Sequence, residues 1–264
     1  MKKEIITIAN QKGGVGKTTT AVNLAASLAI AEKRVLLVDF DPQANSTTSL
    51  GFYKTDYEFN IYHSLIGTKE IDKIILKTTI PTLDLIPSNI DLIAIEKESE
   101  LSIDKELLLR NILRDLKSRY DFIIIDSPPT LGTITINALC ATDSVIIPVQ
   151  CEFFALEGLK QLLNTIQLVK KIKNKTLFIK GVLPTMYSSK DNLSKQVLSD
   201  LSRHFGTKMF IETINNKKQY LVIPRNVRIA EAPSFGKPVA LYDIKSKGAV
   251  SYQKLANIIL EMNK

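Results

Sequence analysis

The feature that most constrains this chain is a loop rich in lysine and glycine near its start. The loop spans residues 10–20 and reads NQKGGVGKTTT. An apolar run, IITIA at residues 5–9, precedes it, and residues 21–29 (AVNLAASLA) follow it with a helical pattern. Strand, glycine-rich loop and helix in this order form a phosphate-binding loop, because glycines let several N–H groups point at one anion beside the positive end of the helix dipole. The sequence therefore predicts a nucleotide site.

The end of the loop carries the residues that such a site needs. Lys17 is expected to reach the β- and γ-phosphates of a nucleotide, and the Thr18 hydroxyl is expected to bind Mg²⁺. The loop departs from the ordinary pattern, since Gln11 stands where the first glycine would be and a second lysine, Lys12, precedes the paired glycines. The predicted nucleotide-binding residues of the loop are Lys12, Gly13, Gly14, Val15, Gly16, Lys17, Thr18 and Thr19.

Aspartates follow two of the apolar runs. Residues 34–38 (RVLLV) lead into Asp39 and Asp41, and residues 122–125 (FIII) lead into Asp126. In an open α/β sheet, ligands bind at the carboxyl ends of the strands. Asp126 therefore fits the Walker B aspartate of a nucleotide-hydrolysing protein, and we expect it to help hold the magnesium ion.

Strand-like and helix-like runs alternate along the rest of the chain. Strands are expected at residues 82–88, 144–149, 177–183 and the start of 220–228, and helices at residues 103–119, 153–171, 192–205 and 248–262. Such alternation predicts one doubly wound, mostly parallel sheet with helices on both faces. A length of 264 residues fits one α/β domain over residues 1–264.

Charge and cysteine content limit the kinds of partner and compartment. The formal net charge is +8, which favours contact with nucleic acid or anionic lipid. Cys140 and Cys151 have no metal-binding spacing, and His63 and His204 stand far apart in the sequence, so we expect no metal cluster and a reduced, cytoplasmic chain. We expect neither a signal peptide nor a membrane span, because no apolar run reaches the required length.

Several phrases of the chain resemble the chromosomal ParA (Soj) branch of the ParA/MinD superfamily. These phrases are KGGVGKT at residues 12–18, DFDPQAN at 39–45, DSPP at 126–129, FFALEGL at 153–159, IPRNVR at 223–228 and EAPSFGKP at 231–238. The resemblance covers nearly the whole chain. That family consists of dimerising, DNA-binding ATPases that act with a ParB partner at a centromere-like site.

The resemblance implies a role for particular residues. Lys12 would cross a dimer interface to the nucleotide of the other subunit, and Asp41 would position the attacking water. Pro224 and Asn226 would lie near the adenine. The positions that match the DNA-binding region of the family are Lys195, Arg225, Arg228 and Lys237. ATP and Mg²⁺ would hold a homodimer on duplex DNA at the nucleoid, and slow hydrolysis to ADP, stimulated by partner and DNA, would release it.

One segment departs from the family pattern. Residues 212–220 (ETINNKKQY) make a longer link into the IPRNVR phrase than is usual in the family. The path of the chain near the adenine is therefore open, and the segment adds Lys217 and Lys218 to the basic surface.

Three other interpretations remain open from the sequence. A membrane-bound ATPase of the MinD type would need a basic amphipathic helix at its end, whereas residues 248–264 carry only Lys254 and Lys264. An iron–sulfur electron donor would need cysteines that bridge a cluster. A scaffold that binds nucleotide without hydrolysis would not need Asp41 and Asp126.

Overall fold

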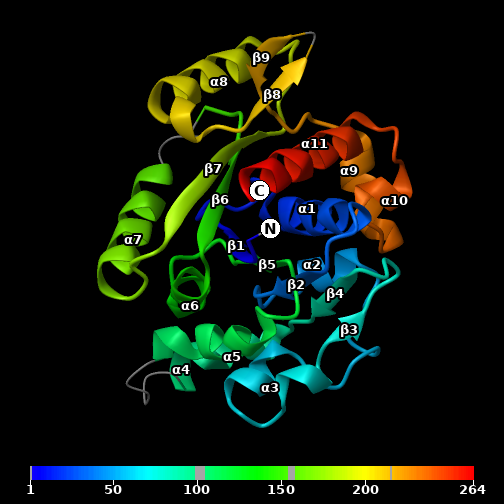
Figure 1. Ribbon diagram of the computed structural model, residues 1–264, viewed down its shortest axis with the longest axis vertical. Coiled ribbons are helices and arrows are strands. Elements are labelled where there is room, and N and C mark those ends of the chain that lie inside the picture. The colour runs from blue at the N-terminus through cyan, green and yellow to red at the C-terminus, as the bar shows by residue number, and fades with distance from the viewer. Residues whose placement is uncertain (1, 99–104, 154–157, 215) are drawn as a thin grey trace.

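A seven-stranded sheet forms the centre of the molecule (Figure 1). The computed structural model describes residues 2–98, 105–153, 158–214 and 216–264. The strand order is β3-β4-β2-β5-β1-β6-β7, and every neighbouring pair is parallel except β3 and β4. The strands are β1 (Glu4–Ile8), β2 (Val35–Asp39), β3 (Leu76–Lys77), β4 (Leu83–Ile86), β5 (Phe122–Asp126), β6 (Ser144–Gln150) and β7 (Phe178–Thr185).

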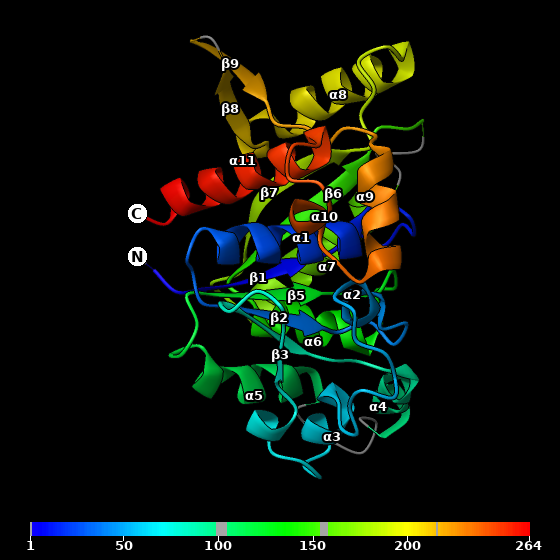
Figure 2. The same cartoon turned by 90° about the vertical axis from the view of Figure 1, so that its right-hand side faces the viewer.

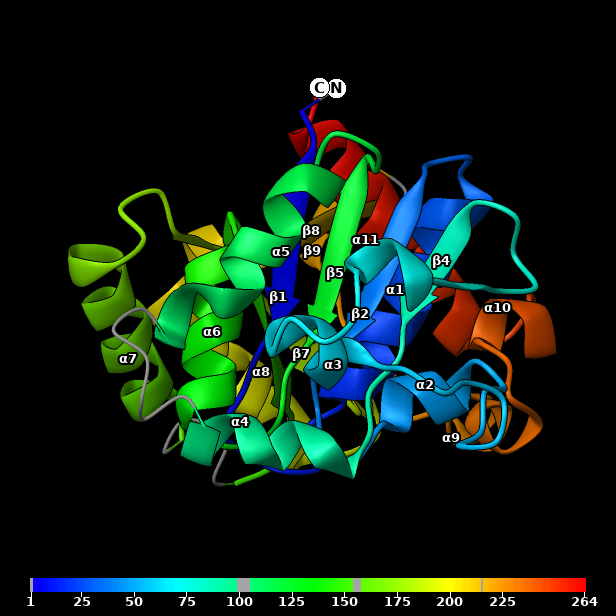
Figure 3. The ribbon, with the colours of Figure 1, turned by 90° about the horizontal axis from the view of Figure 1, so that it is seen from below.

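Helices cover both faces of this sheet. The longer ones are α1 (Lys17–Ile30), α5 (Leu108–Leu116), α6 (Thr133–Ala141), α7 (Leu159–Ile172), α8 (Asn192–Phe205) and α11 (Lys247–Met262), and the short ones are α2 (Asn45–Ser49), α3 (Ile61–Leu65), α4 (Ala94–Glu98), α9 (Val227–Glu231) and α10 (Val239–Tyr242). α5, α6 and α7 lie on one side of the sheet, and α1, α10 and α11 lie on the other (Figure 3). The predicted mostly parallel sheet between two helical layers is confirmed.

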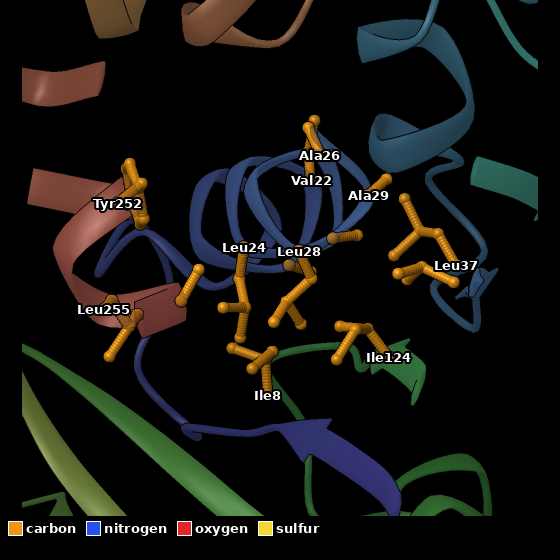
Figure 4. Close-up of a cluster of buried hydrophobic side chains, with 14 of the residues drawn as sticks. Ile8, Val22, Leu24, Ala26, Leu28, Ala29, Leu37, Ile124, Tyr252 and Leu255 are labelled. Atoms are coloured by element: carbon orange, nitrogen blue, oxygen red, sulfur yellow. The ribbon is translucent and has the colours of Figure 1, made fainter. Parts of the chain in front are cut away.

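The central strands are apolar on both faces because both are covered. In β5, Ile124 packs on the α1 side and Ile123 on the α5 side. Figure 4 shows Leu24 and Leu28 of α1 pointing down onto the sheet, with Tyr252 of α11 beside them. Each fully buried leucine or isoleucine stabilises the fold by about 1.5–3 kcal/mol. This packing fixes the start of α1 at the carboxyl end of β1.

The prediction that a strand begins at residue 220 is wrong. β9 (Lys217–Tyr220) pairs antiparallel with β8 (Ile211–Ile214) in a separate two-stranded sheet, which we call the ribbon. The chain after β9 makes isolated hydrogen bonds instead: Leu221 N donates to Phe210 O at 2.8 Å, and Ile223 N donates to Pro184 O at 2.8 Å. Apolar residues there are buried by packing against the main sheet, not by joining it.

Among the longer helices, the predictions differ from the structure at α5, α6 and α7. The sequence does not predict α6, because its residues TITINALCA are buried nearly all round and so lack an amphipathic period. α7 starts at Leu159, later than predicted, and residues 154–157 of that prediction lie outside the described residues. α5 starts at Leu108 after one turn of 3₁₀ helix, and residues 103–104 of its predicted range also lie outside.

The two ends of the chain meet at the amino ends of the parallel strands, opposite the glycine-rich loop (Figure 3). Lys2 N donates to Asn263 O at 3.3 Å. Beneath them Glu4 is buried and accepts hydrogen bonds from Lys180 at 2.8 Å, Asn263 at 2.7 Å and Ser144 at 2.6 Å. Because a buried carboxylate is costly unless it is paired, this network ties β1, β6, β7 and the end of the chain together.

Candidate nucleotide-binding site

The glycine-rich loop connects β1 to α1 at the carboxyl end of the parallel strands, where open α/β sheets bind ligands. Gly14 (φ 72°) and Gly16 (φ 87°) adopt the left-handed conformation that other residues rarely tolerate. The Asn10 side chain fixes the start of the loop. Its Nδ2 donates to Pro148 O at 2.7 Å, and its Oδ1 accepts from Lys12 N at 3.0 Å. The loop is therefore held in shape by the protein itself.

The two lysines of the loop have different surroundings. Lys17 is only 6% exposed, and its ammonium donates to Lys12 O at 3.1 Å across the loop. Burial lowers the pKa of Lys17, whereas the nearby Asp126 and Asp41 oppose that shift. Lys12 is partly exposed and lines a cavity of about 540 Å³ beside the loop. Lys17 thus faces into the site, while Lys12 stands at its rim.

Asp39 and Asp41 follow the same strand but do different things. Asp39 is fully buried and accepts from Thr47 N at 2.8 Å and from the Thr47 hydroxyl at 2.7 Å, so it holds the start of α2. Burial, together with neighbouring Asp126, raises the pKa of Asp39 to about 8. Among the described residues, the Asp41 carboxylate accepts one hydrogen bond, from the Gln43 N–H to one of its oxygens at 3.0 Å. The second oxygen of Asp41 remains available to a ligand or water.

Asp126 fits a bound cation. Asp126 ends β5 and lies beside Asp39, its partner in the register with β2. Its Oδ2 accepts a hydrogen bond from the Ser46 hydroxyl at 2.8 Å. The other oxygen, Oδ1, is buried and has no hydrogen-bond partner in the described part of the chain. An unsatisfied buried oxygen costs about 1–3 kcal/mol, which a cation would relieve. Hydroxyl and carboxylate oxygens are ligands that Mg²⁺ prefers, so Thr18 and Asp126 would hold it.

We expect the affinity for Mg²⁺ to fall as the pH is lowered through about 6. Burial raises the pKa of Asp126 to about 6, against the hydrogen bond from Ser46, so the carboxylate becomes protonated below that pH and the proton competes with the metal. Mg²⁺ titrations of nucleotide binding between about pH 5 and about pH 8 measure the effect. Asp126→Asn should bind Mg²⁺ weakly at every pH. An affinity of the wild type that stays constant across this range would contradict the assignment.

A cavity of about 350 Å³ opens next to the loop and suits a nucleotide base. Its lining residues are Gly16, Thr19, Thr185, Met186, Ile223, Pro224, Arg225, Asn226, Ile229, Ala230, Pro233 and Tyr252. The structure thus brings the predicted Pro224 and Asn226 beside the loop. The sequence does not predict Thr185 and Met186, at the end of β7, because nothing in their local sequence marks them.

The four residues predicted to bind DNA are exposed but come from different elements. Lys195 lies on α8, and Lys237 follows the turn after α9. Arg225 lies beside the loop, where it pairs with Glu152 at 3.3 Å. The guanidinium of Arg228, on α9, pairs with Glu231 at 3.0 Å and with Asp243 at 3.5 Å. Two of the four are therefore already engaged with carboxylates.

The structure weighs against two of the other interpretations. The apolar face of α11, including Tyr252 and Leu255, packs against α1 and is not available to a membrane (Figure 4). No helix among the described residues is long and apolar enough to cross a membrane. Cys140 and Cys151 are both buried, and burial raises the pKa of each thiol, so neither is presented at the surface to bridge a cluster.

Comparison with known proteins agrees with this geometry. A family model described as an AAA domain (AAA_31) matches residues 3–179. The sporulation initiation inhibitor protein Soj of Bacillus subtilis is 52% identical over 253 residues, 96% of this chain and 96% of its own. The chromosome partitioning protein ParA of Myxococcus xanthus is 48% identical over 97% of this chain and 88% of its own.

A solved structure shares the fold and shows what such a site can hold. Cobyrinic acid a,c-diamide synthase from Mycobacterium smegmatis, crystallised with ADP and magnesium, superposes with a TM-score of 0.83 at 35% identity. The match covers 99% of this chain and 95% of the synthase. High identity over nearly the full length of the partitioning proteins, together with the loop and its aspartates, places the chain in one family. It belongs to the Soj/ParA family of chromosome-partitioning ATPases.

Proposed function

We propose that residues 1–264 form a single ATPase domain that dimerises on ATP, binds duplex DNA without sequence preference and acts with a ParB-type partner at the nucleoid. The observation that carries this proposal is the contrast between the two loop lysines. Lys17 is buried and points into its own site, whereas Lys12 stands at the rim beside an open cavity. A lysine at the rim is suited to a nucleotide held by a second copy of the chain.

Hydrolysis by such a site depends on positioning and on neutralising charge. Lys17 and the loop N–H groups would bind the β- and γ-phosphate oxygens, and a Mg²⁺ ion bound by Thr18 and Asp126 would supply further positive charge there. Asp41, with one oxygen available, would orient the attacking water. Lys12 of the other subunit would neutralise charge that develops in the transition state, as a point charge.

The same arrangement makes ATP the link between two subunits. Each γ-phosphate would be held by Lys17 of one subunit and Lys12 of the other, so the dimer is stabilised while ATP is intact and weakened after hydrolysis to ADP. Without an activator, turnover of such switches is slow, at roughly 10⁻⁴ to 10⁻² per second. A dimer also doubles the basic surface offered to DNA, so DNA binding should follow the nucleotide state.

Lys12→Ala is expected to bind ATP as a monomer but to fail to dimerise. The substitution removes the contact between subunits and leaves Lys17 inside its own site. Light scattering coupled to size exclusion, with ADP and then with ATP, measures the effect. Lys175→Ala, an exposed lysine after α7, is the matched control and should dimerise like the wild type.

Two results would separate the proposal from its rivals. If Lys12→Ala dimerises with ATP at the wild-type concentration, the role of Lys12 between subunits is wrong. If the wild type binds ATP but releases no phosphate, with or without DNA, the chain is a nucleotide-binding scaffold and not an ATPase.

A further inference from the structure

The ribbon of β8 and β9 projects from one end of the molecule. It lies at the top of both Figure 1 and Figure 2, beside α8 and above α11. Its two strands pair only with each other, in a sheet separate from the main one. Most of its side chains are exposed, namely Ile211, Thr213, Ile214, Lys217, Lys218 and Gln219. An isolated two-stranded ribbon is marginally stable in water, so this one must be supported at its base.

The base of the ribbon is held by the body of the protein. Phe210 is buried against Gly181 of β7, where even a Cβ would come within 2.4 Å of the ring. Leu221 N donates to Phe210 O at 2.8 Å and closes the ribbon at its root. On one face, Glu212 pairs with Lys254 of α11 at 2.5 Å. These contacts with the body of the protein fix the direction in which the ribbon projects.

Lysines lie on both faces of the ribbon. Successive residues of a strand point to opposite faces, so Lys217 shares a face with Glu212, and Lys218 shares the other face with Tyr220. Glu212 faces α11, while Tyr220 packs toward the cluster under α8. Both lysines are exposed and neither has an ion-pair partner among the described residues. Two free cations thus project from opposite faces of one narrow arm.

The surroundings of the ribbon are also basic. Residues 192–220 contain five lysines and arginines (Lys195, Arg203, Lys208, Lys217 and Lys218) and two carboxylates (Asp200 and Glu212). Both carboxylates are already paired, Asp200 with Arg203 and Glu212 with Lys254. The uncompensated charge therefore belongs to the lysines, which attract a polyanion.

We propose that the ribbon inserts into a groove of duplex DNA, where Lys217 and Lys218 contact the phosphates of the two opposite walls. The major groove, about 12 Å wide, admits a two-stranded ribbon. Lysines on opposite faces can then reach one strand each. On the strands of the ribbon, the Gln219 amide already donates to Glu212 at 2.9 Å and Tyr220 packs inward, so neither is placed to read base edges. The contact therefore fixes position and adds affinity without selecting a sequence.

This inference rests on the proposed DNA binding and adds a specific contact to it. The residues of β8 and β9 line neither cavity beside the loop, and the two strands pair within one copy of the chain. Each subunit would bring one ribbon, so an ATP dimer would engage two at once and gain affinity by linkage. Removing the ribbon lysines should therefore weaken DNA binding while leaving dimerisation and basal ATP hydrolysis unchanged.

The test compares the double variant Lys217→Ala/Lys218→Ala with Lys170→Ala/Lys171→Ala, a second pair of adjacent exposed lysines on α7 that changes the charge equally. Each protein is titrated with ATP onto two unrelated fluorescent duplexes between about 50 and about 200 mM salt. We expect the ribbon variant to bind both duplexes roughly tenfold more weakly. The slope of the logarithm of its binding constant against the logarithm of the salt concentration should be smaller in magnitude by about 0.9 for each phosphate that the protein no longer neutralises. The α7 variant should match the wild type.

Shortening the ribbon gives an independent variant. Because Phe210 and Leu221 are hydrogen-bonded, residues 211–220 can be replaced by a two-glycine link, and this variant should lose as much affinity as the double variant. If only the shortened protein loses affinity, or if the ribbon and α7 variants bind alike, phosphate contact by the ribbon lysines is overturned. If the wild type itself binds no DNA with ATP, the proposed DNA-binding function fails before the ribbon is tested.

Discussion

Lys17→Ala is expected to lower ATP affinity by about 10²- to 10³-fold. Lys17 is buried within the loop, and its ammonium is already aimed across it toward Lys12 O. Each hydrogen bond from a charged group is worth about 1.5–3 kcal/mol, so two such bonds to phosphate are worth about 3–6 kcal/mol, and the lower part of that range corresponds to the expected loss of affinity. Alanine would also leave Asp41 and Asp126 without the nearby positive charge that offsets their repulsion of phosphate.

The measurement is equilibrium binding of a fluorescent ATP analogue with Mg²⁺. Lys12→Ala serves as the matched variant, since it removes the other lysine of the same loop and should bind the analogue nearly as well as the wild type. Circular dichroism before titration excludes unfolding as the cause. If both variants lose the same affinity, Lys17 does not bind the nucleotide of its own subunit while Lys12 binds that of the other, and the proposed roles are wrong.

Asp41→Ala is expected to slow ATP hydrolysis by about 10²- to 10⁴-fold while the ATP-bound dimer accumulates. Positioning of the nucleophile by a carboxylate typically contributes on this scale. Asp41 is 6% exposed, near Lys17, and uses one oxygen for the Gln43 N–H. Because it is not expected to bind Mg²⁺ or phosphate, its removal should leave nucleotide affinity nearly intact.

Phosphate release under single-turnover conditions, together with the fraction of dimer, distinguishes this role from a structural one. Asp115→Ala, an exposed aspartate on α5, is the control and should hydrolyse ATP at the wild-type rate. If Asp41→Ala keeps most of its turnover, Asp41 does not position the water. Asp39 is a poor substitute for that role, because both Thr47 hydrogen bonds would have to break to free its carboxylate.

Local patterns in the sequence are enough to predict the loop and the strand ends. Lys17 and Thr18 are predicted from the loop motif, and Asp126 from an apolar run that ends in aspartate, because each of these patterns lies within a few consecutive residues. The mostly parallel sheet follows from the alternation of strands and helices, since apolar runs such as residues 122–125 can be buried on both faces only between helical layers.

Other features depend on contacts between distant segments, which local sequence patterns do not specify. Thr185 and Met186 reach the base cavity only because β7 ends beside the loop. Asp39 and Asp41 look alike in the sequence, but only in the structure does Thr47 donate its hydroxyl hydrogen bond to Asp39. The ribbon falls within a segment that the sequence marks only as a long link, because four-residue strands with polar tips carry little pattern.

Because Lys2 N donates a hydrogen bond to Asn263 O, residues 2 and 263 lie side by side. A short linker could join residue 264 to residue 2, and new ends could be opened in an exposed loop without breaking the sheet. Fluorescent proteins fused at either end would sit at the amino ends of the parallel strands, opposite the glycine-rich loop (Figure 3). Such fusions would leave Lys12 and its neighbouring cavity uncovered, so labelled protein should report on dimerisation without obstructing it.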